Sequence, residues 1–290
     1  MMLYDLLLAP FFDFEFMRRA MVGMLALAFG AAPVGVFLLL RRMSLTGDSM
    51  AHAILPGAAI GYLIAGLSLT AMTIGGIVAG LTVAFGAGAV ARTTVLKEDA
   101  ALATFYLLSL ALGVTIVSLH GSNVDLLHVL FGSVLALDDD ALVLLASIST
   151  VTMVTLALIF RPLVMECVDP AFLRSVSSAG APVHFAFMGL VVINLVAGFH
   201  ALGTLLAVGI MILPAASARL WTRDLSATIG IAVLVAMLSG YAGLVMSYAR
   251  GLPSGPAIIL AAGTIYLLSL VFGRVSGLLW RVLPRRHLEA

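Results

Sequence analysis

Long runs of apolar residues, separated by short polar stretches, recur along the whole chain. Most runs approach the roughly 20 residues that a helix needs to cross the hydrocarbon core of a bilayer. Acidic and basic residues fall almost entirely between the runs. The pattern predicts an all-α polytopic membrane protein with eight or nine transmembrane helices. The expected spans are 17–40, 49–66, 69–91, 100–119, 141–160, 182–199, 202–218, 225–248 and 254–272.

Two of these spans, 49–66 and 202–218, are shorter than most of the others. They contain Pro56 and Pro214, and a proline inside a helix removes one backbone hydrogen bond. We therefore expect kinked or broken helices at these two places.

No linker or change of composition divides the chain, so residues 1–290 are expected to form a single transmembrane domain. Its first part, 1–16, is apolar with interspersed acids. Such a segment favours a short amphipathic helix that lies at the membrane interface.

Composition strengthens the assignment to the membrane. Hydrophobic residues make up 62% of the chain and charged residues only 10%, with a mean hydropathy of +1.19. A soluble domain carries about 25% charged residues, so membrane lipid is an expected partner. No basic stripe indicates binding of nucleic acid. The single cysteine, Cys167, excludes an internal disulfide and a cysteine-rich zinc site.

The distribution of arginine sets the expected orientation. Basic residues gather in alternate connections and in the last residues of the chain, whereas Asp125 and the acidic run 138–140 fall in an opposite loop. Cytoplasmic loops are enriched in basic residues. The connections after the first, third, fifth, seventh and ninth spans, and the C-terminus, are therefore expected in the cytoplasm. Arg18 and Arg19, at the outer start of the first span, are exceptions.

Asp48 and His52 are the most informative polar residues near a membrane segment. They lie four positions apart, so a helix would place both on one face. A carboxylate oxygen with an imidazole nitrogen suits a divalent transition metal, and ionisable groups inside a bilayer usually mark a pathway. Two alternatives remain open: Asp48 is the N-cap of the second span, and His52 bonds to a neighbouring helix.

Residues 161–180 are expected on the cytoplasmic side as a short helix outside the membrane. Asp169 and Pro170 favour a helix start, with Asp at the N-cap and Pro at the first helical position. Gly180 is the expected end. The helix would carry Phe172 and Val176 on one face.

Several functional classes are disfavoured by what the sequence lacks. It has no Gly-x-x-x-x-Gly-Lys-Ser/Thr loop, so the chain is not expected to hydrolyse ATP itself. An intramembrane metalloenzyme remains the alternative from another class, but its usual His-Glu-x-x-His element is absent. A proton-coupled carrier would need further acids within the spans, and these are almost absent.

Four stretches, in order along the chain, resemble the membrane permease subunits of ATP-binding-cassette importers for zinc and manganese. The first is RRMSLTGDSMAHAILPG at 41–57, which contains the Gly-Asp-x-x-x-His element. The second is DLLHVLFGS at 125–133, and the third runs through 201–219 and contains the sequence ILPAASAR. The fourth is PSGP at 253–256, similar to the Pro-x-Gly-Pro start of the last helix in that family.

The resemblance implies a set of partners and a place in the cell. The partners are a second copy of the chain, two cytoplasmic ATPase subunits and an extracytoplasmic metal-binding protein. The complex would lie in the bacterial cytoplasmic (inner) membrane and work by alternating access. No permanently bound cofactor is expected, since the metal is cargo.

The resemblance also implies roles for particular residues. Asp48 and His52 would line the metal path, and a two-fold axis would bring two copies together as four ligands, the number that zinc usually takes in a closed site. Segment 161–180 would hold a coupling helix that docks on the ATPase, with Asp169, Phe172, Arg174 and Val176 as its important residues. An ordinary interfacial helix is the alternative.

The outer side and the identity of the metal leave choices open. His120, Asp125 and His128 would form a metal entry relay, or they are simply solvated in an interfacial loop. Imidazole favours zinc, whereas carboxylate and water favour manganese. The outer histidines make Zn²⁺ the main expectation, with Mn²⁺ or iron as the alternative.

Overall fold

The computed structural model describes residues 7–66, 68–119, 135 and 137–279, and the longer regular elements in this part of the chain are all helices. They are α2 (Ala9–Asp13), α3 (Glu15–Leu40), α4 (Thr46–Ala65), α5 (Leu69–Thr93), α6 (Glu98–Leu119), α8 (Asp139–Val168), α9 (Pro170–Val176), α10 (Gly180–Leu202), α11 (Thr204–Arg219), α12 (Leu225–Arg250) and α13 (Ser254–Phe272). The all-α membrane fold expected from the sequence is confirmed.

Nine of these helices correspond in order to the nine expected spans. Seven are long and apolar enough to cross a membrane, and α4 and α11 are the other two. The 16 residues of α11 make it a short span, as the sequence indicated. Both α4 and α11 continue as one helix past their internal prolines, Pro56 and Pro214, so no break occurs there.

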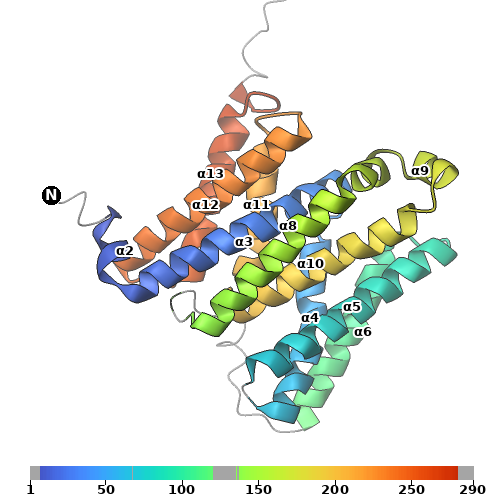
Figure 1. Cartoon of the computed structure of the whole chain (residues 1–290), viewed down its shortest axis with the longest axis horizontal. Coiled ribbons are helices and arrows are strands. Elements are labelled where there is room, and N and C mark those ends of the chain that lie inside the picture. The colour runs from blue at the N-terminus through green and yellow to red at the C-terminus, as the bar shows by residue number, and fades with distance from the viewer. Residues whose placement is uncertain (1–6, 67, 120–134, 136, 280–290) are drawn as a thin grey trace, which may run out of the picture.

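The helices form three neighbouring groups (Figure 1). In the centre, α3, α8 and α10 lie side by side, and the contacts α3–α8 and α8–α10 hold them together. On one flank, α4, α5 and α6 pack on one another, and α5 also packs on α10. On the other flank, α11, α12 and α13 pack together, and α11 and α12 also pack against α3. The short helix α9 follows α8 at one end of the bundle.

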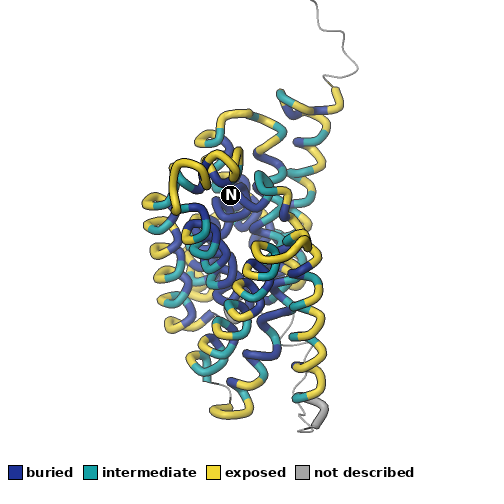
Figure 2. The backbone as a smooth tube through the Cα atoms, turned by 90° about the vertical axis from the view of Figure 1, so that its right-hand side faces the viewer, coloured by how far each residue is buried: buried dark blue, intermediate teal, exposed yellow. Residues whose placement is uncertain are grey.

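The core runs through the middle of this arrangement, along α3 and α10. In each of these helices 72% of the most apolar stretch is buried, a larger share than in any other of the seven spans. Figure 2 shows the buried backbone in the middle and the exposed positions on the outer helices. A polar bond crosses the core, because Nδ2 of Asn194 in α10 donates to Oγ1 of Thr152 in α8 at 2.7 Å. A buried bond of this kind fixes the relative position of two apolar helices.

Aspartates and glycines set several helix ends. Asp138, Asp169 and Asp224 each accept a backbone N–H with the side chain at the N-terminus of α8, α9 and α12. Gly203 alone connects α10 to α11 with φ of +88°. Glycine adopts that conformation without a steric penalty, so the chain reverses there within one residue.

The segment after the fifth span differs from expectation. Helix α8 does not end near residue 160 but continues through Arg161 and Pro162 to Val168. Packing explains the extension, because Leu163 is fully buried and outweighs the local preference of the Arg-Pro pair. The expected stop at Gly180 is wrong: α9 ends at Val176, and Gly180 begins α10.

The outer start of α3 shows how an arginine is accommodated there. Nη2 of Arg19 lies 2.7 Å from Oε1 of Glu15 and 3.1 Å from Oδ1 of Asp139, at the start of α8. Nη1 of Arg18 donates to the carbonyl of Phe12 at 3.0 Å. Arg19, an exception to the expected charge distribution, is therefore balanced by two carboxylates.

Candidate functional site

Helix α4 presents Asp48 and His52 together on one face. Nε2 of His52 lies 4.0 Å from Oδ1 of Asp48, and the two side chains are 41% and 69% exposed in the single chain. The N-cap of α4 is Leu45, with no side-chain capping bond, so the alternative of Asp48 as the cap is wrong. Within the described residues Asp48 is the recorded polar neighbour of His52, and the imidazole ring lies 6.5 Å from the ring of Tyr106. Both side chains are accessible from outside the described chain.

The packing of α4 explains why this face points outward. A Cβ on Gly57 would overlap the carbonyl of Gly75, and one on Gly61 would overlap the carbonyl of Ala71. The backbones of α4 and α5 therefore touch directly, as small residues permit in membrane helices. On α6, Oγ of Ser109 donates to the carbonyl of Ala53 at 3.1 Å. α5 and α6 thus hold most of α4, and within the described residues the Asp48–His52 face stays partly exposed.

On this face of α4, the described part of one chain holds two neighbouring candidate metal ligands, Asp48 and His52. Among the residues that the structure describes, no group of three or more His, Cys, Asp or Glu lies together in a way that could hold a metal ion. Structural transition-metal sites usually take four protein ligands. The proposed entry residues His120, Asp125 and His128 lie outside the described residues.

Helix α9 has one anchored side and one free side. Oδ1 of Asp169 accepts the N–H of Phe172 at 2.9 Å, which confirms the expected helix start. Leu173 is 3% exposed and fixes the helix to the bundle, whereas Phe172 and Val176 are 50% and 67% exposed. Arg174 is also exposed. Two apolar side chains therefore project outward beside a cation, an arrangement suited to docking. Leu173 was not singled out from the sequence.

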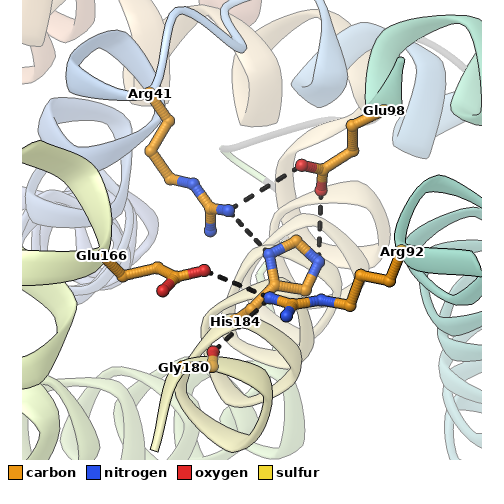
Figure 3. A network of polar contacts seen from close by, with 6 residues as sticks. All are labelled: Arg41, Arg92, Glu98, Glu166, Gly180 and His184. Atoms are coloured by element: carbon orange, nitrogen blue, oxygen red, sulfur yellow. Dashed lines mark hydrogen bonds and ion pairs between the residues drawn. The ribbon is translucent and has the colours of Figure 1, made fainter. Parts of the chain in front are cut away.

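Near α9, a network of charged side chains joins the ends of five helices (Figure 3). Nη2 of Arg41, which caps α3, lies 2.6 Å from Nδ1 of His184 in α10. On the other side of the ring, Nε2 lies 3.2 Å from Oε1 of Glu98, the first residue of α6. Because a guanidinium can only donate, Nδ1 accepts and the ring is neutral, with its proton on Nε2. This N–H faces the Glu98 carboxylate but does not meet hydrogen-bond geometry. The buried imidazole thus links α3, α6 and α10.

The second half of the network ties α5 to α8. Nη2 of Arg92 lies 3.1 Å from Oε1 of Glu166 and donates to the carbonyl of Gly180 at 3.5 Å. Each arginine also covers an aromatic ring, Arg41 over Phe187 and Arg92 over Phe185, at 5.6 and 5.7 Å from the centroids. These cation–π contacts add an attraction for each guanidinium beyond its ion pair.

A cavity of about 440 Å³ opens between this network and α9. Pro170 and Arg174 of α9 line it, together with Arg41, Arg92, Glu98 and Glu166. Nη1 of Arg41 and Oε2 of Glu166 are buried without a hydrogen-bond partner among the described residues. The network was not expected from the sequence. Its geometry connects the start of the α3–α4 turn, which leads to Asp48, with the region around α9.

Comparison with known proteins agrees with this arrangement. Residues 13–273 match the ABC 3 transport family. The manganese transport system membrane protein MntC of Halalkalibacterium halodurans is 30% identical over 276 residues, which cover 93% of each chain. A probable iron transport system membrane protein of Haemophilus influenzae is 27% identical over 273 residues, covering 94% of this chain and 99% of that one.

A solved structure shares both sequence and fold with the chain. It is PsaBC from Streptococcus pneumoniae in complex with Fab, which matches with 28% identity and a TM-score of 0.81 over 93% of this chain and 96% of the other. The resemblance carried by the four sequence stretches is thereby confirmed. The chain belongs to the ABC 3 transport family, as a membrane permease subunit of a metal importer that is not itself an ATPase.

Proposed function

We propose that this chain is the permease subunit of an ATP-driven manganese importer. The observation that carries the proposal is the pair Asp48 and His52, which share an exposed face of α4 and have no other recorded ion-pair partner among the described residues. The two transport relatives described above are named for manganese and for iron. They favour manganese, the alternative expected from the sequence, over zinc, and a carboxylate ligand suits Mn²⁺.

In this proposal two copies of the chain form the metal path. A two-fold axis next to α4 would bring two Asp48 and two His52 side chains around one ion. Four ligands drawn from two chains bind well enough for entry and yet can separate for release, which is what a pathway requires. The exposure of both side chains in the single chain supports this arrangement, because the face is available to a partner.

Energy would come from two ATPase subunits that dock on α9. Phe172, Arg174 and Val176 form the exposed side that would enter a groove on the ATPase. Movement of α9 would reach α5 through the Arg92–Glu166 ion pair and would reach α4 through its backbone contact with α5. An extracytoplasmic binding protein would deliver the ion on the opposite side. The orientation follows the arginine distribution, with α9 and the C-terminus in the cytoplasm.

Uptake into liposomes tests the proposal directly. Liposomes that contain the chain with its ATPase and binding protein are expected to accumulate radioactive manganese when ATP is supplied. The variants Asp48→Asn and His52→Ala are expected to lose at least nine-tenths of that uptake, as about 10–100-fold losses are usual for metal ligands and their supports. Asp13→Asn, an exposed carboxylate in α2, serves as the matched control.

Competition then identifies the metal. Manganese uptake that persists in excess zinc supports manganese as the substrate. If excess zinc abolishes manganese uptake and zinc itself accumulates in the liposomes, the chain belongs to a zinc importer. Wild-type uptake in both Asp48→Asn and His52→Ala would overturn the assignment of the metal path, since the proposed ligands would then be dispensable.

A further inference from the structure

A second cavity, of about 310 Å³, lies at the ends of α3, α11 and α12, apart from the Asp48–His52 pair. Its lining combines apolar with polar residues, and the exposed Arg219, Arg223 and Ser276 form its mouth. The apolar residues are Val36, Leu39, Leu40, Ala215, Leu225 and Val275. The polar residues are Arg219, Thr222, Arg223, Thr228 and Ser276. Among the residues that the structure describes, no carboxylate lines this cavity, in contrast to the cavity beside α9.

The polar mouth is equipped to hold an anion. Arg219 ends α11 and Arg223 follows four residues later, and both are exposed, with no ion pair recorded for either within the described chain. The nearest acid in sequence, Asp224, is engaged elsewhere, since its Oδ2 accepts the N–H of Ala227 at 2.7 Å as the cap of α12. Thr222 accepts the N–H of Asp224 at 3.2 Å, so its hydroxyl proton remains available. Two guanidinium groups with nearby hydroxyls suit a phosphate group.

The walls of the cavity are held in place without a ligand. After α13 the chain turns back, and the N–H of Val275 donates to the carbonyl of Leu220 at 3.0 Å. The N–H of Leu278 donates to the carbonyl of Leu270 at 2.9 Å. These bonds fix the turn that carries Val275 and Ser276 against the connection between α11 and α12. The cavity is thus a preformed pocket between membrane helices.

The surroundings favour a lipid over a free phosphate ion. Trp221 is 38% exposed, and its Nε1 donates to Oγ of Ser269 at 2.9 Å. Tryptophan is enriched at the headgroup level of membranes. Phe272 and Leu278 are exposed nearby in the chain, at 51% and 48%. An apolar interior below a basic mouth complements an acyl chain below a phosphate.

We propose that this pocket binds an anionic phospholipid, with the phosphate between Arg219 and Arg223 and the glycerol and upper acyl chain against the apolar wall. Basic pockets between membrane helices on the cytoplasmic side take such headgroups. The pocket lies away from α9, which packs on α8 and α10. The site does not depend on the proposed transport of manganese, and only its leaflet follows from the proposed orientation.

Retention of lipid by the purified full-length chain tests this site. The chain is incubated with equal parts of phosphatidylglycerol and phosphatidylcholine in detergent, and the bound lipid is counted by native mass spectrometry. The wild type is expected to retain phosphatidylglycerol preferentially. Arg219→Gln with Arg223→Gln is expected to weaken retention about tenfold or more, as loss of charged hydrogen bonds does. Lys97→Gln with Arg161→Gln removes equal charge elsewhere on the same side and is expected to behave as the wild type.

A second variant distinguishes lipid binding in the pocket from attraction of the lipid by surface charge alone. Ser276→Trp leaves both arginines in place but fills the mouth, and it is expected to lose the preference as well. The melting temperature in phosphatidylcholine alone shows that each variant is folded. The wild type is expected to gain stability when phosphatidylglycerol is added, and the arginine double variant is not.

Two results would overturn the proposal. One is equal retention of phosphatidylglycerol by the wild type, the arginine double variant and Ser276→Trp. The other is stabilisation by inorganic phosphate alone to the same extent as by the lipid, which would mean that the acyl wall adds nothing.

Discussion

Arg92 at the end of α5 forms an ion pair with Glu166 near the end of α8, at 3.1 Å, although the two residues lie 74 positions apart in the chain. The Glu166 side chain is 6% exposed and that of Arg92 is 25% exposed. This pair joins the helix group that holds Asp48 and His52 to the helix that leads into α9.

Breaking this pair is expected to destabilise the chain. Arg92→Ala leaves the buried Glu166 carboxylate uncompensated and should lower the free energy of unfolding by about 2 kcal/mol, less than for a fully buried pair because Arg92 is partly solvated. Removal of both partners should cost less than the sum of the two single changes. Thermal unfolding of Arg92→Ala, Glu166→Gln and the double variant forms the cycle that measures this coupling.

Arg161→Ala is the control for this cycle, because Arg161 is exposed on α8 and has no recorded ion pair in the described chain. Its melting temperature should match that of the wild type. Strict additivity of the Arg92 and Glu166 changes would show that the two side chains do not act on each other.

The exposed side of α9 is expected to serve docking, and its buried side is expected to serve stability. Phe172→Ala removes an exposed ring and should leave the melting temperature unchanged while weakening association with the ATPase subunit about tenfold or more. Leu173→Ala removes a buried side chain and should cost about 2–4 kcal/mol of stability. Pull-down of the purified ATPase, together with thermal unfolding, distinguishes the two. If both variants bound the ATPase as well as the wild type does, α9 would not be the docking element.

Adding a single methyl group at the contact between α4 and α5 is expected to destabilise the chain. Gly57→Ala places a Cβ against the carbonyl of Gly75, so the two backbones must move apart, at a cost of about 1–3 kcal/mol or more. Gly263→Ala in α13 is the matched control, because nothing lies within 4 Å of its added Cβ. The control should be neutral or slightly stabilised, since alanine is the better helix former. Equal melting temperatures for the two variants would contradict the close packing.

Metal stoichiometry tests the shared site. If two chains contribute one aspartate and one histidine each, equilibrium dialysis should find one Mn²⁺ per two chains. The electron paramagnetic resonance signal of bound Mn²⁺ should carry coupling to imidazole nitrogen, and His52→Ala should remove it. Asp13→Asn should preserve both results. One ion per single chain would show that the ligands come from elsewhere.

Much of this fold is predictable because local chemistry fixes it. Apolar runs locate the nine spans, and all their ends but that of α8 within a few residues, and Asp169 followed by Pro170 locates the start of α9. The shared face of Asp48 and His52 follows from their spacing of four, since helical periodicity alone decides it. These features depend on neighbours along the chain.

The features that sequence reasoning missed depend on distant residues. In the sequence Arg41 and Arg92 resemble ordinary arginines at helix ends, and only tertiary packing brings them to His184 and Glu166. The extension of α8 has the same origin, because the burial of Leu163 lies outside what an Arg-Pro pair reveals. The end of α9 was misplaced because Gly180 fits the start of one helix as well as the end of another.

The direct backbone contact between Gly57 and Gly75 is expected to couple the movements of α4 and α5. A shift of α4 at Asp48 and His52 is therefore expected to displace the end of α5, at Thr93 and Thr94, as well. A spectroscopic label at Thr94, which is exposed, would then report movement of α4 from a distance. Movement of the Asp48–His52 face thus becomes observable without a change to either side chain.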